Sequence, residues 1–73
     1  MTAGGHMPLS ARNHLTGTIE SVEREGLMAR VVIRVGPHLV ESIITRQSAD
    51  DLNLQVGDHV TAVIKATEVM VSK

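Results

Sequence analysis

The 73-residue sequence contains no cysteine, phenylalanine, tyrosine or tryptophan. Without thiols there are no disulfides and no cysteine-ligated metal sites. Without aromatic rings, the sequence lacks the stacking platform on which proteins usually bind single-stranded nucleic acid. No apolar run approaches the roughly 18 residues of a membrane span, and no signal peptide is recognisable. These absences favour a cytoplasmic protein without a membrane or nucleic-acid partner.

Charge and size set two further limits. The sequence has seven basic and eight acidic residues, so its formal charge is −1. It shows no cluster of basic residues typical of nucleic-acid binding. Valine, isoleucine, leucine, alanine and methionine supply the whole hydrophobic content of 42%. A single small domain with such a core is marginal in isolation, and small domains often compensate by oligomerisation. We therefore expect this chain to associate with copies of itself.

The hydrophobic pattern predicts five strands and one short helix. Alternation is clearest over 27–35, and the offset of three between Ile19 and Val22 predicts a bulge or strong coiling in the first strand. Glu25-Gly26 and Gly36-Pro37 are turn pairs, and Ser48-x-x-Asp51 has the spacing of a helix capping box. The predicted strands cover 15–23, 27–35, 39–45, 60–66 and 69–71, with a helix of about two turns between 45 and 54.

This element order predicts an all-β fold. Three strands, a short helix and two further strands match a five-stranded Greek-key barrel of the OB type, in which the helix lies between strands 3 and 4. We interpret residues 1–6 as a tag remnant and Met7 as the native start. Residues 7–73 then form a single domain.

Three short clusters of hydrogen-bond donors are the candidate binding residues. Each has an ordinary explanation: turn formation for the first, helix capping for the second, and a lysine reaching water from an apolar strand for the third. If the clusters converge, they line a pocket that donates hydrogen bonds but accepts few. Such a pocket favours a fully deprotonated tetrahedral dianion over phosphate, because phosphate is partly protonated near neutral pH. The clusters are Ser10-Ala11-Arg12-Asn13, Thr45 with Ser48, and Lys65-Ala66-Thr67.

Enzymatic and metal-binding motifs are not recognisable in the sequence. There is no cysteine nucleophile, no glycine-rich phosphate loop and no meaningful Ser/His/Asp spacing. His14, His38 and His59 lie on separate predicted elements without the spacing of a metal site. We therefore predict a binding protein rather than an enzyme, without a directly ligated metal ion.

Three ordered blocks resemble the molbindins, or molybdenum-pterin-binding proteins (Mop domain, TOBE-like). The similarity runs from about Met7 to Lys73, although His14 and His38 depart from the family pattern. The blocks are Ser10-Ala11-Arg12-Asn13-x-Leu15-x-Gly17, Ser42-Ile43-Ile44-Thr45-x-x-Ser48, and Val60-Thr61-Ala62-Val63-Ile64-Lys65-Ala66-Thr67-x-Val69-Met70.

The resemblance implies a fold, an assembly and a ligand. It implies an OB-like barrel, a homohexamer built as a trimer of dimers, and molybdate or tungstate held as an oxyanion at subunit interfaces. The expected function is intracellular molybdenum storage and homeostasis, and the alternative is a molybdate-sensing regulatory module that docks to a partner protein. The oxyanion contacts implied by the resemblance are Ser10, Ala11, Arg12, Thr45, Ser48, Lys65 and Ala66.

Overall fold

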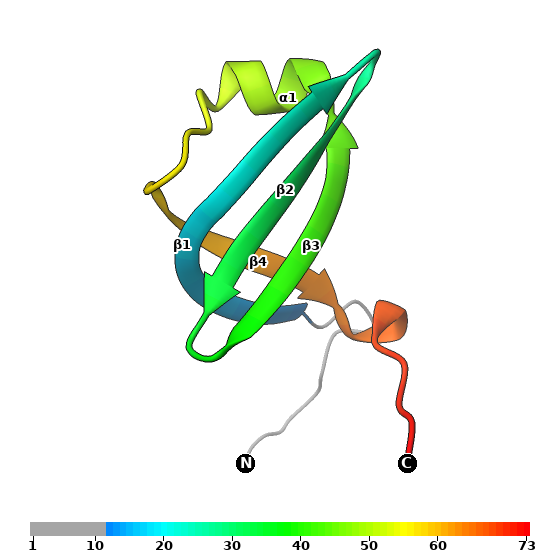
Figure 1. Cartoon of the computed structure of the whole chain (residues 1–73). Helices are drawn as coiled ribbons and strands as arrows, with labels where there is room; N and C mark the ends of the chain where they lie inside the picture. The colour runs from blue at the N-terminus through cyan, green and yellow to red at the C-terminus, as the bar shows by residue number, and fades with distance from the viewer. Residues whose placement is uncertain (1–11) are drawn as a thin grey trace.

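A computed structural model describes residues 12–73 as a curled antiparallel sheet with one short α-helix (Figure 1). The predicted tag remnant at 1–6, the native start at Met7, and the first two predicted contacts, Ser10 and Ala11, lie outside the described residues. The elements are β1 (Arg12–Glu25), β2 (Met28–Val35), β3 (His38–Thr45), α1 (Arg46–Asp51), β4 (His59–Lys65) and the 3₁₀-helix η2 (Ala66–Glu68).

The sheet has the strand order β3-β2-β1-β4, and all of its neighbours are antiparallel. Strands β1 to β3 form a meander, and β4 returns to lie beside β1, which is Greek-key topology. The predicted all-β fold with one helix between β3 and β4 is confirmed. Neither α1 nor η2 is long and apolar enough to cross a membrane.

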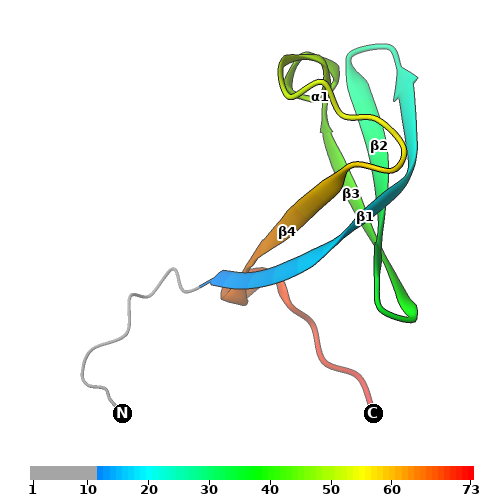
Figure 2. The ribbon, with the colours of Figure 1, turned by 90° about the vertical axis from the view of Figure 1, so that its left-hand side faces the viewer.

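Strand β1 belongs to both halves of the molecule because it bends. Its first half pairs with β4 and its second half with β2, and Figure 2 shows the β1–β4 ribbon extending away from β2 and β3. The β1–β2 register shifts between Ile19 and Ser21, which pair with Ile33 and Val32. The extra residue is a β-bulge, so the prediction from the spacing of Ile19 and Val22 is confirmed.

The concave face of the sheet carries the core. Ile19 is only 1% exposed and packs with Val31, Ile33 and Ala62. Ala29, Val31 and Ile33 are buried on that face, as the alternation predicted, but Val32, which was predicted for the opposite face, is also buried. Leu27 was predicted to join them. It lies instead in the turn after β1 and is 86% exposed, because β2 begins one residue later, at Met28.

Helix α1 starts earlier than the capping-box prediction. Its N-cap is Thr45, whose side chain accepts a hydrogen bond from the Ser48 backbone N–H at 3.1 Å. The β3 ladder ends at Thr45, and the next amide, that of Arg46, donates to the Leu27 carbonyl. The chain therefore turns into the helix at Arg46, which places Ser48 inside the first turn.

The fifth predicted strand, 69–71, was wrong for this chain. Within residues 12–73 the segment pairs with no strand, and its one backbone hydrogen bond runs from the Val69 N–H to the Ala66 carbonyl. Helix η2 turns the chain at the end of β4, and the segment then runs away from the sheet (Figure 1). The sheet therefore has four strands, and its barrel is open on one side.

Candidate functional site

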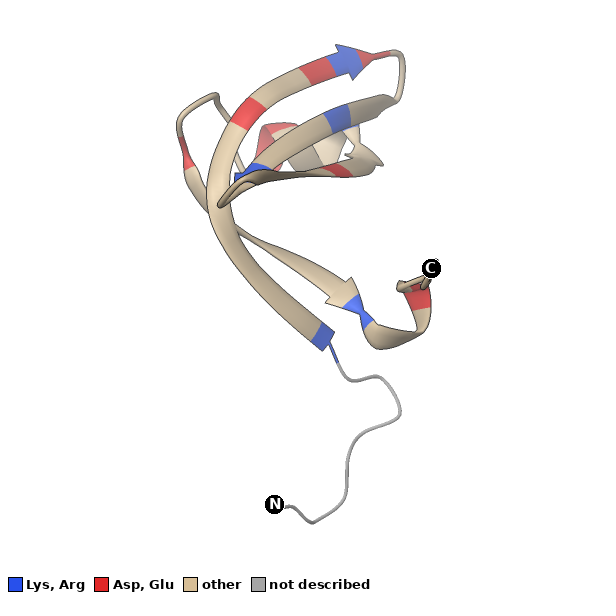
Figure 3. Ribbon diagram, turned by 60° about the horizontal axis from the view of Figure 1, so that its bottom comes forward, with Lys and Arg blue, Asp and Glu red and all other residues tan. Residues whose placement is uncertain are grey.

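Arg12 and Lys65 lie directly opposite each other on neighbouring strands. They are the first register pair of β1 and β4, and both residues are exposed. Paired residues of antiparallel strands project from the same face, so the two cations share one end of the ribbon (Figure 3). The first donor cluster was predicted to precede the first strand. Arg12 belongs to the strand itself, because β1 starts three residues earlier than its alternation indicated.

Other arginines of the sheet are neutralised by carboxylates. Arg24 pairs with Asp50 at 2.7 Å, Arg34 with Glu20, and Arg30 with both Glu23 and Glu41. The hydrogen bond from Arg30 lowers the pKa of the Glu41 carboxyl, and the same bond raises the pKa of Arg30.

The Arg12–Lys65 pair lacks this kind of neutralisation. Among the ion pairs of residues 12–73, none involves Arg12 or Lys65. Arg46 and Lys73 also form none there, but neither lies in a strand opposite another cation. Like charges directly opposite each other destabilise a sheet, so this pair favours an anion beside it.

Thr45 and Ser48 form a second donor group. The Thr45 hydroxyl donates to Ser48 Oγ at 2.7 Å while it accepts from the Ser48 N–H. Thr45 therefore uses its proton and one lone pair within the cap. The Ser48 hydroxyl receives a hydrogen bond and keeps its own proton for a further acceptor, and both residues are exposed.

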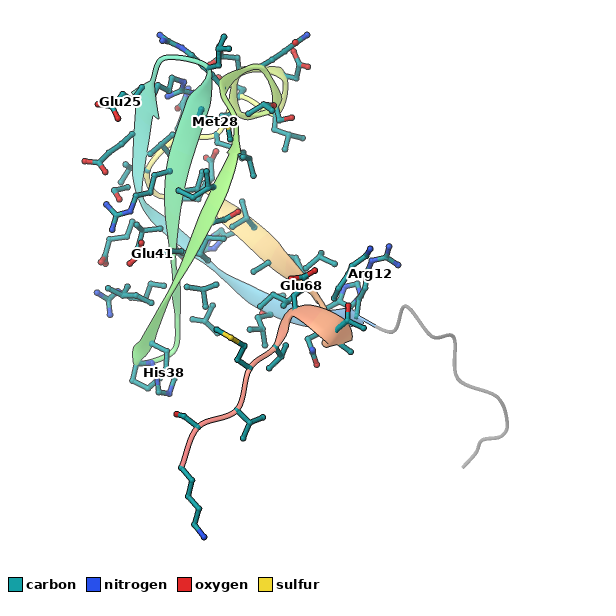
Figure 4. The ribbon with its side chains drawn as sticks, turned by 90° about the vertical axis from the view of Figure 1, so that its right-hand side faces the viewer. Arg12, Glu25, Met28, His38, Glu41 and Glu68 are labelled. Carbon is teal, nitrogen blue, oxygen red and sulfur yellow. The ribbon has the colours of Figure 1, made fainter. Side chains whose placement is uncertain are left out.

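The two donor groups lie at different ends of the sheet. Ala66 begins η2 directly after Lys65, so Arg12, Lys65 and Ala66 lie together. Thr45 is the register partner of Met28, and Figure 4 places Met28 far along the sheet from Arg12. One copy of the chain therefore brings Arg12, Lys65 and Ala66 together. It leaves Thr45 and Ser48 at the other end of the sheet.

The outer face of the β1–β4 ribbon carries more donors than we predicted. Every second register pair of β1 and β4 lies on this face, which gives four pairs. Of their eight residues only Val63 is apolar and none is acidic. Alternation of polar residues along both strands could have revealed this row in the sequence. The pairs are Arg12–Lys65, His14–Val63, Thr16–Thr61 and Thr18–His59.

Glu68 departs from the predicted donor-only lining. It lies in η2, and its carboxylate is at the same end of the molecule as Arg12 (Figure 4). No group of three histidine, cysteine or carboxylate side chains in residues 12–73 is arranged to hold a metal ion. The arrangement is suited to an anion held by two cations and hydroxyls.

Comparison with known proteins places these residues in a family. The TOBE domain family matches residues 9–71. Molybdenum-pterin-binding protein 3 of Clostridium pasteurianum is 42% identical over 66 residues, which cover 89% of this chain and 97% of that protein.

Solved structures share the fold. A molybdate-binding protein from Sporomusa ovata superposes with a TM-score of 0.83 at 39% identity, covering 92% of this chain and 100% of that one. The cytoplasmic molybdate-binding protein ModG, solved with molybdate bound, gives a TM-score of 0.73 at 36% identity over 90% of this chain and 48% of its own. From these matches over most of its length, the chain belongs to the TOBE domain family, among the molybdenum-pterin-binding proteins.

Proposed function

We propose that this protein binds molybdate or tungstate as an intact oxyanion and serves intracellular molybdenum storage and homeostasis, without catalysis. The observation that carries the proposal is the Arg12–Lys65 pair, two adjacent exposed cations with no ion-pair partner in residues 12–73. Relatives that bind molybdenum-pterin or molybdate support the choice of ligand.

The chemistry of the donors favours a dianion that carries no proton. Guanidinium, ammonium and backbone N–H groups donate and cannot accept. Molybdate and tungstate are fully deprotonated near neutral pH, whereas phosphate has a pKa near 6 and is partly protonated. We propose that Arg12 and Lys65 supply the charge, that Ser10 and Ser48 supply hydroxyl protons, and that the remaining contacts come from Ala11, Thr45 and Ala66.

The complete site requires two copies of the chain. Arg12 and Lys65 lie at one end of the sheet and Thr45 and Ser48 at another, so one copy supplies each half. Large apolar side chains are exposed on the surface, among them Ile43 and Met70, and burying them against a second copy would favour self-association. We propose a homohexamer built as a trimer of dimers, with the oxyanion at subunit interfaces.

Calorimetric titration with molybdate, tungstate, sulfate and phosphate tests the ligand. R12A and K65A should each weaken molybdate binding at least tenfold, because each removes charge-assisted hydrogen bonds of about 1.5–3 kcal/mol. K73A removes the same charge from an exposed residue outside the site and should bind as wild type does. Wild-type affinity in both R12A and K65A would refute the assignment.

Native gel filtration separates storage from the regulatory alternative. A hexamer that retains several molybdate ions after desalting supports storage. A smaller species that assembles only with a second protein supports a molybdate-sensing module instead.

A further inference from the structure

One histidine lies on the donor face beside the two unpaired cations. His14 follows Arg12 by two residues in β1, and residues two apart in a strand project from the same face, about 6–7 Å from each other. The register partner of His14 is Val63, so Lys65 is its diagonal neighbour on β4, at a distance that long side chains span. Leu15 packs against the core, which leaves His14 exposed on the opposite face. His14 therefore belongs to the same cluster as Arg12 and Lys65.

The ring of His14 is available to a ligand. Among the side-chain hydrogen bonds of residues 12–73, none involves this ring. Val63, directly across the ribbon, is apolar and offers no carboxylate or hydroxyl to it. By contrast, Nδ1 of His59, further along the same face, lies 3.4 Å from the Thr18 hydroxyl. His14 thus presents both ring nitrogens on the face that carries the cations.

The protonation chemistry of histidine distinguishes His14 from its neighbours. Histidine is the side chain that ordinarily gains or loses a proton between about pH 5 and 8. The protonated ring donates from both nitrogens, whereas the neutral ring donates from one and accepts at the other. The charged groups that face His14 are Arg12 from β1, Lys65 from β4 and, at the same end of the molecule, Glu68 from η2 (Figure 4). Arginine, lysine and glutamate side chains ordinarily keep their charge throughout this range.

We propose that His14 is a third cationic contact of the oxyanion site and that it couples molybdate binding to the uptake of one proton. The inference rests on the proposed function, because it requires the anion to lie beside Arg12 and Lys65. A dianion close to an imidazole favours the protonated ring, so the anion and the proton bind cooperatively. The proton comes from solvent and stays on the ring, while the anion remains deprotonated. The site therefore holds molybdate more tightly in mild acid and releases it as the pH rises.

The size of the effect follows from the distances along the ribbon. In a water-like dielectric, one positive charge about 7 Å from a dianion strengthens binding roughly sevenfold before screening by salt. We therefore expect the affinity to be about three- to tenfold higher at about pH 6 than at about pH 8. His59 lies opposite Thr18, six residues along β1 from Arg12 and thus about 20 Å away. That distance is about twice the Debye length at ordinary ionic strength, so the charge of His59 has little influence on the site.

Calorimetric titration with molybdate at about pH 6 and pH 8, at one fixed ionic strength, tests the coupling. H14Q carries no charge at either pH and should bind at both with the affinity that wild type shows at pH 8. H14K carries a charge at both and should bind at both about as tightly as wild type does at pH 6. H59Q is the matched control, because it makes the same change on the same face, and it should keep the pH dependence of wild type.

Proton NMR supplies a readout that does not depend on affinity. The ring resonances of His14, assigned by their absence in H14Q, should titrate at a higher pH with molybdate present than without it. The expected displacement of the midpoint is about 0.5–1 pH unit, which is the reciprocal of a three- to tenfold effect on anion binding. The midpoint of His59 should stay unchanged.

The outcomes separate this inference from the proposed function. Wild-type protein that binds molybdate equally at both pH values overturns the role of His14 and leaves molybdate binding intact. The same holds if H14Q or H14K keeps the pH dependence of wild type, or if H59Q loses it. Wild-type protein that binds no molybdate at either pH overturns both proposals.

Discussion

Gly17 is the point where the fold tolerates no side chain. It lies in β1 opposite Val60, close to β2, and a Cβ atom there would overlap the carbonyl oxygen of Arg34. The same Cβ would lie 2.9 Å from Ile33 Cγ2 and 3.0 Å from Val35 Cγ2, closer than real Cβ atoms normally approach. The backbone oxygen cannot rotate away, so β1 and β2 must separate where the ribbon meets the rest of the sheet.

The cost of G17A follows from this geometry. Overpacking costs about 1–3 kcal/mol, and the upper end applies here because the clash is with a backbone oxygen. The lower chain entropy of unfolded alanine offsets only about 0.5–1 kcal/mol of this cost. A net loss of about 2 kcal/mol corresponds to a fall in Tm of about 8–16 °C for a domain of this size. Thermal unfolding followed by circular dichroism measures this, at one fixed protein concentration because the stability of an oligomer depends on concentration.

The control for G17A is G26A. Gly26 has a φ of +58° and open space around the added Cβ, so alanine there costs only the left-handed backbone conformation, about 1 kcal/mol. G17A should therefore lose more stability than G26A. A G17A protein that is as stable as wild type, or more stable, would refute the steric argument, because without a clash alanine stabilises an extended strand.

Three further predictions concern single side chains. T45A removes the N-cap of α1 and should cost about 1 kcal/mol of unfolding free energy in a urea titration, whereas T45S keeps the oxygen and should cost little. The Arg30 hydrogen bond lowers the pKa of Glu41 below its ordinary value of 4.5, so the stability that Glu41 contributes is complete above pH 4.5 and is lost as the pH falls through the lowered pKa. Unfolding midpoints of wild type and E41Q should thus converge in acid, and a gap that stays constant with pH would contradict this. E68Q removes the carboxylate at the Arg12 end and should strengthen molybdate binding by about two- to fivefold, measured by calorimetry; weaker binding would show that Glu68 supports the site.

Local patterns predicted most of the elements. Alternation located β2 and assigned its buried face, and the spacing of Ile19 and Val22 located the bulge. Both predictions succeed because the two faces of a strand differ in their exposure to water, so apolar and polar residues alternate in the sequence. Element ends were less predictable. Ser48 has the spacing of a cap, but the end of the β3 ladder made Thr45 the N-cap.

The fifth strand shows the limit of a pattern in one chain. Val69-Met70-Val71 has strand-forming residues, and its composition predicted a strand that the structure does not form. A strand also needs a partner, and in residues 12–73 the segment has none. Composition records the preference of a segment for pairing, not which edge, or which copy of the chain, supplies the pairing.

By itself, the sequence determined which residue types are available: an aliphatic core without rings, strands in Greek-key order, and three clusters of donors. Only the tertiary structure decided that Arg12 and Lys65, from opposite ends of the chain, share one register pair, and that Thr45 and Ser48 lie at the other end of the sheet. The reason is that periodicity assigns a residue to a face through local geometry. Which residue stands opposite it depends on the register of antiparallel strands, and a shift of one residue would change every partner.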